Sequence, residues 1–182
     1  MTTNIQLSDG IELLDGTMFS YTNPDVSSIT IEMLADVLSR INRFAGHTKH
    51  FYSVAQHAAN CSLIVAEGFE LEALLHDTAE AFTNDLPTPL KVMLPKVKQI
   101  EGKIEKALAA KFGTAYPMAD EVKLADLQML GIEKDYLKPS SSHWAILDGI
   151  DYEPLASKAV MGKMNPDEAR TFFLRRYREL TK

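Results

Sequence analysis

The sequence predicts an all-α fold: a helical bundle with a short N-terminal arm that is either irregular or a β-hairpin. From about residue 29 onward apolar residues recur at helical spacing, while glycines and prolines divide the chain into helix-length stretches. Apolar residues make up 46% of the 182 residues, which suffices for the core of one domain spanning residues 1–182.

The N-terminal arm carries two turn signals, Ser8-Asp9-Gly10 and Asp15-Gly16, with short apolar stretches around them. We expect the first helix to begin near residue 29 and to end at Gly46. One face of this helix is formed by Ile31, Leu34, Leu38 and Ile41, with Val37 and Phe44 alongside.

Two helices should follow this first one. Ser53 and Gln56 form a capping-box pattern that begins the second helix, and Gly68 suits its C-terminal cap. A third helix is expected over about residues 71–82, after which the prolines from Pro87 onward break the chain.

The last three helices are expected at residues 96–112, at 120–137 and from 165 to about 180. Gly113 separates the first two, and Pro139 follows the second. The third begins with Asn165-Pro166-Asp167-Glu168, which supplies an N-cap, a proline at the first helical position and a glutamate at the third.

Charge and composition exclude several classes of function. The formal charge of −6 disfavours general nucleic-acid binding, because an acidic chain repels a phosphate backbone. No apolar run reaches the ~20 residues that a membrane span needs. The single cysteine, Cys61, fits a buried, inert thiol, and no signal peptide is recognisable at the start. These features indicate a cytoplasmic protein.

The strongest chemical signal is the pair His76-Asp77, which directly follows two leucines. Polar side chains are costly to bury without partners, and imidazole and carboxylate both bind divalent transition metals. His57 and Asp126 are polar residues in two other apolar helical stretches. Because facing helices can bring such side chains to one point, we expect a metal site formed by His57, His76, Asp77 and Asp126.

Each of these residues also has a purely structural explanation. Taken alone, His57 fits a hydrogen-bonded core histidine, and Asp126 fits a charge on a helix surface. The occurrence of all four in this order, on three different helices, favours the metal site.

The order His57, His76-Asp77, Asp126 resembles the HD superfamily of metal-dependent phosphohydrolases. Arg43-Phe44, residues 53–57 (SVAQH) and residues 76–91 (HDTAEAFTNDLPTPLK) are similar to a narrower group within it. That group contains bacterial 5′-deoxynucleotidases and short phage-type dATP triphosphohydrolases. The similarity covers about residues 30–135 and implies the HD-domain helical bundle.

The resemblance implies a proton-transfer role for Glu80. This residue follows Asp77 by three positions and His76 by four, which places it on the same face of the expected helix. A carboxylate near a water activated by a cation can move a proton. The alternative is an ordinary exposed helix glutamate.

Five further residues are candidates for substrate binding. Arg43 suits a phosphate clamp, because a guanidinium can grip phosphate through two hydrogen bonds. Phe44 matches an aromatic position, often tryptophan, that contacts the sugar or base; packing in the core is its alternative. Asp85 is a candidate for a deoxyribose hydroxyl or a simple turn residue. Lys91 and His47 are candidates for phosphate contacts, or else solvated side chains.

We expect this chain to hydrolyse deoxynucleotides with one tightly bound zinc, cobalt or manganese ion. No histidine occurs between residues 78 and 125, so a second ion, such as magnesium, is expected only with bound substrate. The leading version is a triphosphohydrolase that releases a deoxynucleoside and triphosphate from a dNTP, because the short chain and the loop at 46–48 look like the phage-type enzymes. The alternative is a 5′-deoxynucleotidase that acts on dNMPs.

Two other functions remain open at this point. Enzymes of the superfamily that hydrolyse (p)ppGpp carry an acidic pair where this chain has Glu80-Ala81, which counts against that activity. A non-catalytic metal-binding regulatory module is the other rival, and the intact Glu80 argues against it. Because enzymes of this group often self-associate, the resemblance also implies a homo-oligomer.

Overall fold

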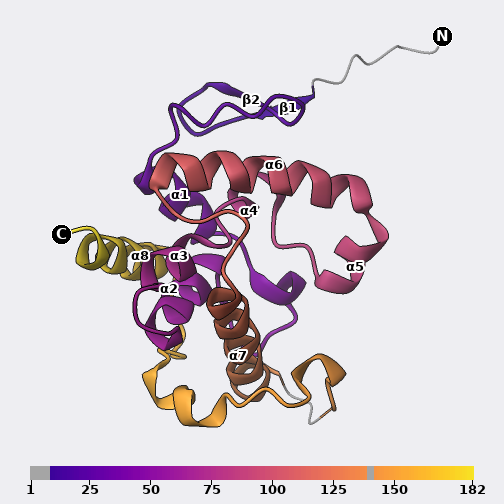
Figure 1. Cartoon of the computed structure of the whole chain (residues 1–182), viewed down its shortest axis with the longest axis vertical. Coiled ribbons are helices and arrows are strands. Elements are labelled where there is room, and N and C mark those ends of the chain that lie inside the picture. The colour runs from indigo at the N-terminus through magenta and orange to yellow at the C-terminus, as the bar shows by residue number, and fades with distance from the viewer. Residues whose placement is uncertain (1–8, 139–141) are drawn as a thin grey trace.

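The computed structural model describes residues 9–138 and 142–182, and α-helices dominate it (Figure 1). A small antiparallel sheet forms the N-terminal arm, so the predicted all-α bundle with a β-hairpin arm is confirmed. Ser8 and Pro139, two of the turn and helix-end signals, lie outside the described residues. No described helix combines the length and the apolar character that crossing a membrane requires.

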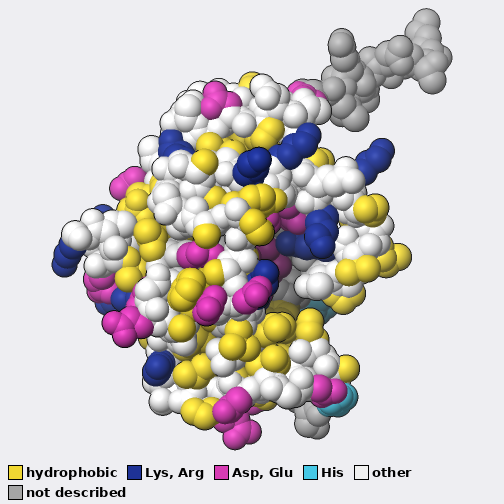
Figure 2. All heavy atoms as spheres, in the orientation of Figure 1, with side chains coloured by type: hydrophobic (Ala, Val, Ile, Leu, Met, Phe, Trp, Pro, Cys, Tyr) yellow, Lys and Arg dark blue, Asp and Glu magenta, His cyan; other side chains and the backbone are white. Residues whose placement is uncertain are grey.

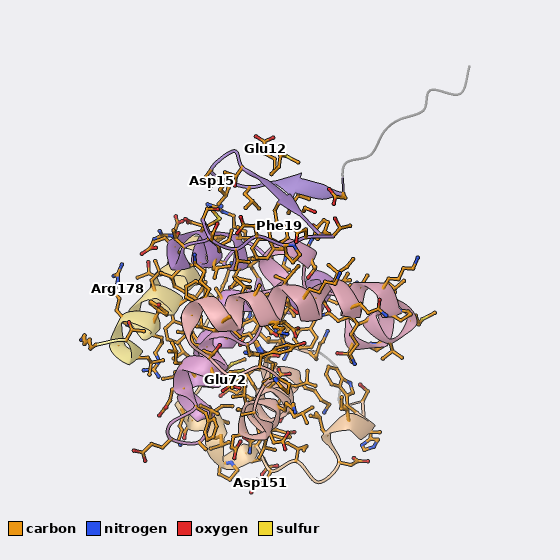
Figure 3. The ribbon with its side chains drawn as sticks, turned by 45° about the horizontal axis from the view of Figure 1, so that its top comes forward. Glu12, Asp15, Phe19, Glu72, Asp151 and Arg178 are labelled. Carbon is orange, nitrogen blue, oxygen red and sulfur yellow. The ribbon has the colours of Figure 1, made fainter. Side chains whose placement is uncertain are left out.

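The hairpin pairs β1 (Gly10–Glu12) with β2 (Met18–Ser20) and lies over the helices. Glu12 and Asp15 are on its outer side, whereas Phe19 points toward the helical body (Figure 3). The Phe19 ring stacks on Phe82, with ring centroids 4.2 Å apart. This aromatic contact attaches the arm to the core.

The centre of the bundle is α2 (Val54–Ile64), in which every residue except Leu63 is buried. Around it pack α3 (Glu70–Leu75), α7 (Asp120–Leu137) and α8 (Pro166–Leu180). Three small residues allow these neighbours to approach closely: Ala55, Ala58 and Ala59. Polar side chains on a helix as buried as α2 need partners, which makes it a natural carrier for a functional site.

The first helix is shorter than the sequence predicts. α1 (Ile31–Leu38) ends well before Gly46, because the following backbone pairs with the segment that precedes α2. Arg43 N–H donates to the carbonyl of Tyr52, and Val54 N–H donates to the carbonyl of Ile41. Residues 43–46 form a separate 3-10 turn, η1 (Arg43–Gly46), so Phe44 does not lie on the first helix.

The remaining helices follow the sequence more closely. α6 (Pro95–Phe112), α7 and α8 match the predicted ranges, and Asn165 and Glu168 form the expected capping box. The sequence predicts that the prolines from Pro87 onward break the chain. They instead lie at the start of an additional short helix, α5 (Thr88–Met93). Proline is compatible with the first turn of a helix, where its missing N–H has no intrahelical partner.

Two 3-10 turns, η2 (Ala145–Leu147) and η3 (Glu153–Lys158), connect α7 to α8. Gln56 of α2 does not complete the predicted capping box. Its amide donates instead to the carbonyls of Val160 and Gly162, at 3.0 and 2.9 Å. Asn60 holds the same segment through the backbone N–H of Val160, at 2.8 Å. Two buried polar residues of α2 thus fix the chain that leads into α8.

Candidate active site

The structure brings His57, His76, Asp77 and Asp126 together. The Nε2 atom of His57 is 3.5 Å from Asp77 Oδ2 and 3.2 Å from Asp126 Oδ1. The Nε2 atom of His76 is 3.2 Å from Asp77 Oδ2 and 3.8 Å from Asp126 Oδ1. Ligands bound at ~2.0–2.2 Å to one ion lie roughly 3–3.5 Å apart, so the spacing suits a shared divalent cation.

A break in the predicted 71–82 helix makes this convergence possible. α3 ends at Leu75, and α4 (Glu80–Thr83) begins only after a turn. Within the turn, the N–H of Thr78 donates to the carbonyl of Leu75, and that of Glu80 donates to Asp77, both three residues back. The Thr78 hydroxyl also donates to the Leu75 carbonyl, which competes with helical pairing. The prediction of one continuous helix is therefore wrong.

The tighter turn has a useful consequence for Glu80. In a 3-10 arrangement, residues three apart lie directly above one another. Asp77 and Glu80 therefore share one face of the turn, as the sequence predicts of a regular helix.

Both histidines are held so that Nε2 faces the group of four. His76 Nδ1 donates to the carbonyl of Ala73 at 2.8 Å, and its buried Nε2 has no hydrogen-bond partner. His57 Nδ1 lies 2.6 Å from Oε1 of Glu133. In each case the Nδ1 contact leaves Nε2 as the free nitrogen, which is the arrangement typical of metal-binding histidines. The residues present therefore fit a divalent metal.

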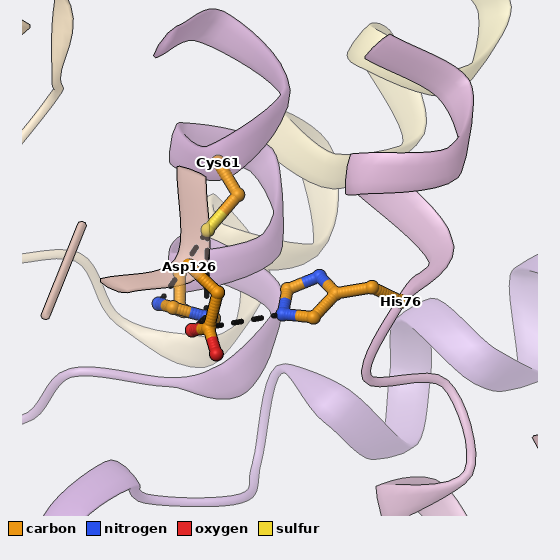
Figure 4. A group of neighbouring side chains, drawn as sticks. Cys61, His76 and Asp126 are labelled. Carbon is orange, nitrogen blue, oxygen red and sulfur yellow. Dashed lines mark hydrogen bonds and ion pairs between the residues drawn. The ribbon is translucent and has the colours of Figure 1, made fainter. Parts of the chain in front are cut away.

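Cys61 competes with Asp77 for a place in this site. His57, Cys61, His76 and Asp126 each offer a ligand atom, all within 4.8 Å of one another (Figure 4). The Cys61 sulfur, however, is 3.4 Å from Nε2 and 3.9 Å from Nδ1 of His57. Such similar distances place it beside the ring and not beyond Nε2, where an ion bound by that nitrogen would lie. The geometry therefore favours Asp77 over Cys61.

The charges of the site also suit a cation. Burial lowers the pKa of His57 and His76, but the surrounding acidic groups outweigh it and hold both values well above the ordinary range. Burial raises the pKa of Asp126, yet the nearby imidazoles of His57 and His76 keep it well below its usual value. The two aspartates are thus ionised, and in the absence of an ion the protonated imidazoles balance their charge. A bound divalent cation would take the place of these protons, because histidine binds metals through a deprotonated nitrogen.

Arg43 is buried and lies beside the candidate metal ligands His57, Asp77 and Asp126. Its NH2 is 3.2 Å from Glu133 Oε2, and its NH1 is 3.5 Å from Asp77 Oδ2. Its Nε is buried without a hydrogen-bond partner. A charged group with a free donor beside a metal site is suited to bind an anion.

Glu80 is also buried, and Lys91 reaches it. Lys91 Nζ is 3.1 Å from Glu80 Oε1 and 3.2 Å from Glu101 Oε1. Burial, followed by the charges of Asp77 and Asp85, raises the pKa of Glu80 well above its ordinary value, and Lys91 opposes the rise. A carboxyl group with a raised pKa can retain its proton near neutral pH and donate it.

The other candidate substrate residues differ in their relation to the site. Asp85 is partly buried, and burial raises its pKa while the charge of Arg43 lowers it. Asp85 therefore lies near the charged residues of the candidate site. The imidazole of His47 is exposed, and the described contacts of this residue are backbone bonds that hold its loop. The structure therefore does not bring the His47 side chain to the site.

Phe44 contacts two residues that the sequence did not indicate. Lys138 Nζ lies 4.4 Å from the centre of its ring, and the Trp144 ring lies 6.2 Å away, centroid to centroid. Both come from beyond the end of α7, and nothing in the local sequence signals their approach. Phe44 itself has a positive φ of 56°, which is rare for a non-glycine residue.

Glu133 is a third residue that sequence reasoning missed. It is fully buried on α7, two helical turns after Asp126, and contacts both His57 and Arg43. A signal was present, because an acidic residue that directly follows Gly131-Ile132 on the face of Asp126 is unusual in a core.

The chain is similar to a protein family and to several known proteins. The family described as 5′-deoxynucleotidase YfbR-like matches residues 37–122, which contain every predicted site residue except Asp126. The protein YfdR of Escherichia coli strain K12, described as uncharacterized, is 40% identical over 172 residues, covering 94% of this chain and 95% of its own.

Two other relatives match shorter parts of the chain. The uncharacterized protein RCAP_rcc00048 of Rhodobacter capsulatus is 27% identical over 139 residues, covering 69% of this chain and 71% of its own. The 5′-deoxynucleotidase PM0747 of Pasteurella multocida is 53% identical, but only over 38 residues, 21% of this chain and 20% of its own. The chain belongs to one family with YfdR, and its match to the YfbR-like family supports an HD-domain phosphohydrolase; it is an enzyme.

Proposed function

We propose that this protein is a 5′-deoxynucleotidase, which hydrolyses deoxynucleoside monophosphates to deoxynucleosides and phosphate. The observation that carries the proposal is the buried Glu80 carboxyl, with its raised pKa, beside the His57, His76, Asp77 and Asp126 group. The family match and the name of the Pasteurella relative favour this activity. They lend no support to the phage-type dATP triphosphohydrolase that the sequence analysis placed first.

We further propose that the four residues hold one divalent transition metal. Two imidazoles and two carboxylates suit zinc, cobalt or manganese. When bound, such an ion polarises the phosphate and lowers the pKa of the attacking water. A second ion, such as magnesium, would depend on the phosphate of the substrate for much of its ligation.

The side chains divide the remaining work. Arg43 binds the phosphate and stabilises the charge that develops on its oxygens. Glu80 donates its proton to the 5′ oxygen of the leaving deoxynucleoside. Lys91 holds the Glu80 carboxyl in place, with its Nζ 3.1 Å from Oε1 of Glu80. Phe44 and Trp144 offer flat apolar surfaces for the nucleoside, and Asp85 is our candidate for the sugar hydroxyl.

Product identification tests the reaction. Purified protein is incubated with dNMPs, rNMPs, dNTPs and (p)ppGpp in the presence of Mn²⁺, Co²⁺ or Zn²⁺, and the products are separated by chromatography. We expect a deoxynucleoside and inorganic phosphate from dNMPs. Release of triphosphate from dNTPs would support the phage-type reaction instead, and pyrophosphate from (p)ppGpp would support alarmone hydrolysis. Binding of nucleotides without turnover would indicate a regulatory module.

We also propose that the protein forms a homo-oligomer in the cytoplasm. Apolar side chains gather over α5 (Figure 2), where Val92 and Met93 are 77% and 76% exposed. Exposed apolar surface of this kind is typical of protein contacts. Sedimentation of the purified protein tests the proposal, and we expect Val92→Glu to shift the oligomer toward monomer.

A further inference from the structure

The side chain of Glu133 joins two functional residues that approach the site from different elements. One of its oxygens, Oε1, is 2.6 Å from Nδ1 of His57 on α2. The other, Oε2, is 3.2 Å from NH2 of Arg43 in η1. Glu133 is completely buried, and so is its pairing with both partners.

The contact with His57 determines which imidazole nitrogen is free. A carboxylate that accepts the Nδ1 proton fixes the tautomer, orients the ring and makes Nε2 a stronger electron donor. Nε2 of His57 is the atom that faces Asp77 and Asp126, at 3.5 and 3.2 Å. Glu133 therefore acts on the ligand atom through the opposite side of the ring.

The contact with Arg43 anchors the guanidinium by one edge. The ion pair at NH2 is the shorter of two, because NH1 makes a longer one with Asp77 at 3.5 Å, and Nε has no partner. Arginine side chains lose rotamer freedom when they bind an anion, and an anchored guanidinium has already lost it. The anchor thus prepares the remaining donors for phosphate.

We infer that Glu133 is a positioning residue that sets metal affinity through His57 and phosphate affinity through Arg43. The second half of this inference rests on the proposed function, in which phosphate is the bound anion. A role in stability alone does not account for the arrangement, because a buried ion pair is often no more stabilising than apolar residues of similar volume. The two oxygens of one carboxylate instead couple the two halves of the site.

Two substitutions separate the two contacts. In Glu133→Gln, the amide oxygen can still accept the proton of His57, but the amide NH2 then faces Arg43, donor against donor. We expect metal affinity to change little and the inhibition constant of inorganic phosphate to rise about tenfold or more. In Glu133→Ala both contacts are lost, and we expect metal binding to weaken by about 10- to 100-fold as well.

Metal affinity is measured on the metal-free protein by competition with a chromophoric chelator, and the visible spectrum of bound Co²⁺ reports ligand geometry. The matched control is Glu101→Gln, which removes another buried glutamate, one that contacts Thr83 and Lys91. We expect this control to bind metal as the wild type does. If Glu133→Ala also binds metal like the wild type, the inference is wrong while the proposed function stands.

If Glu133→Ala does not fold, Arg43→Met/Glu133→Leu replaces the buried ion pair with apolar side chains of similar size, which such sites tolerate. We expect this double variant to bind metal about 10- to 100-fold more weakly than Arg43→Met alone. Equal metal affinities would overturn the inference. A wild-type protein that binds no metal would overturn both the inference and the proposed metal site, so the two failures can be told apart.

Discussion

At the scale of single residues, the proposed metal ligands can be tested by replacing them one at a time. We expect His57→Ala and Asp77→Ala to lose metal binding and activity while the helices persist, because each removes an atom that faces the other ligands. Cys61→Ala is the matched control, since its sulfur lies beside the His57 ring. Elemental analysis after dialysis, with circular dichroism, checks both. Full metal content in His57→Ala, or its loss in Cys61→Ala, would show that the ligand set is wrong.

Ionisation of Glu80 should determine how kcat falls at alkaline pH. Its pKa is raised by burial and lowered by Lys91, and its protonated form is the proton donor that we propose. Activity should therefore fall as pH rises through this pKa. Lys91→Met removes the cation that favours the carboxylate, so the pKa rises further and the alkaline limb of kcat should move to higher pH. Steady-state rates across pH test this, and a limb that stays in place would contradict it.

The size of the Glu80 contribution is a separate prediction. We expect Glu80→Ala to retain its metal and to lose at least roughly 10²-fold in turnover, the usual scale for a lost proton-transfer group. Metal analysis and single-turnover rates on the best dNMP provide the measurement. Unimpaired turnover in this variant would remove Glu80 from the mechanism.

Some of these residues could be recognised in the sequence, and others could not, for physical reasons. His57 and Asp126 were recognisable because polar residues in apolar helical stretches need an explanation. Glu133 gives the same kind of signal. Trp144 gives none, because it reaches Phe44 only through the path of the chain after α7, which no local pattern specifies.

At the scale of elements, the turn that carries Arg43 stores backbone strain. Phe44 and Ala45 have φ values of 56° and 50°, a left-handed conformation that costs an L-residue roughly 1–2 kcal/mol. Lys138 restrains the turn by donating to the carbonyl of His47 at 2.6 Å. The strain is thus retained where the chain presents Arg43 and Phe44 to the site, as is common at functional sites.

This strain predicts that Ala45→Gly stabilises the protein. Glycine adopts positive φ without steric cost, although it also gains freedom in the unfolded chain. We therefore expect the free energy of unfolding to rise by up to about 1 kcal/mol. The matched control is Ala110→Gly, an exposed position inside α6, where glycine should destabilise by about 1 kcal/mol. Urea unfolding measures both, and equal effects of the two substitutions would contradict the account.

The elements that the sequence predicted well are those that local patterns define. α6 and α8 have apolar residues at helical spacing, Gly113 separates α6 from α7, and the Asn165 cap marks the start of α8. The end of α1 and the break between α3 and α4 depend on pairing with distant backbone and on the Thr78 hydroxyl. Helical periodicity alone does not reveal such competing bonds.

At the scale of the whole molecule, the site joins segments that are far apart in the chain. His57 lies on α2, His76 and Asp77 lie in the turn after α3, and Asp126 lies on α7. The start of α7 is fixed by Glu72 of α3, whose carboxylate accepts the backbone N–H of Ala119 at 2.6 Å. The same helices that form the core therefore align the ligands.

A cation shared by these three segments should stabilise the fold as a whole. The folded chain brings the ligands together in advance, whereas the unfolded chain offers no preformed site to compete for the ion. At a free metal concentration of 100 times Kd, linkage predicts about 2.7 kcal/mol of added stability.

We expect one tightly held ion per chain in the resting enzyme, because no histidine lies between residues 78 and 125 and His143, at 74% side-chain exposure, faces away from the core. Elemental analysis and thermal unfolding before and after chelation test this together: the metal-free protein should unfold at a lower temperature, and His57→Ala should show no such difference. Two tightly held ions per chain would contradict the prediction of a single ion. A Tm that chelation leaves unchanged would mean that the ion does not stabilise the fold.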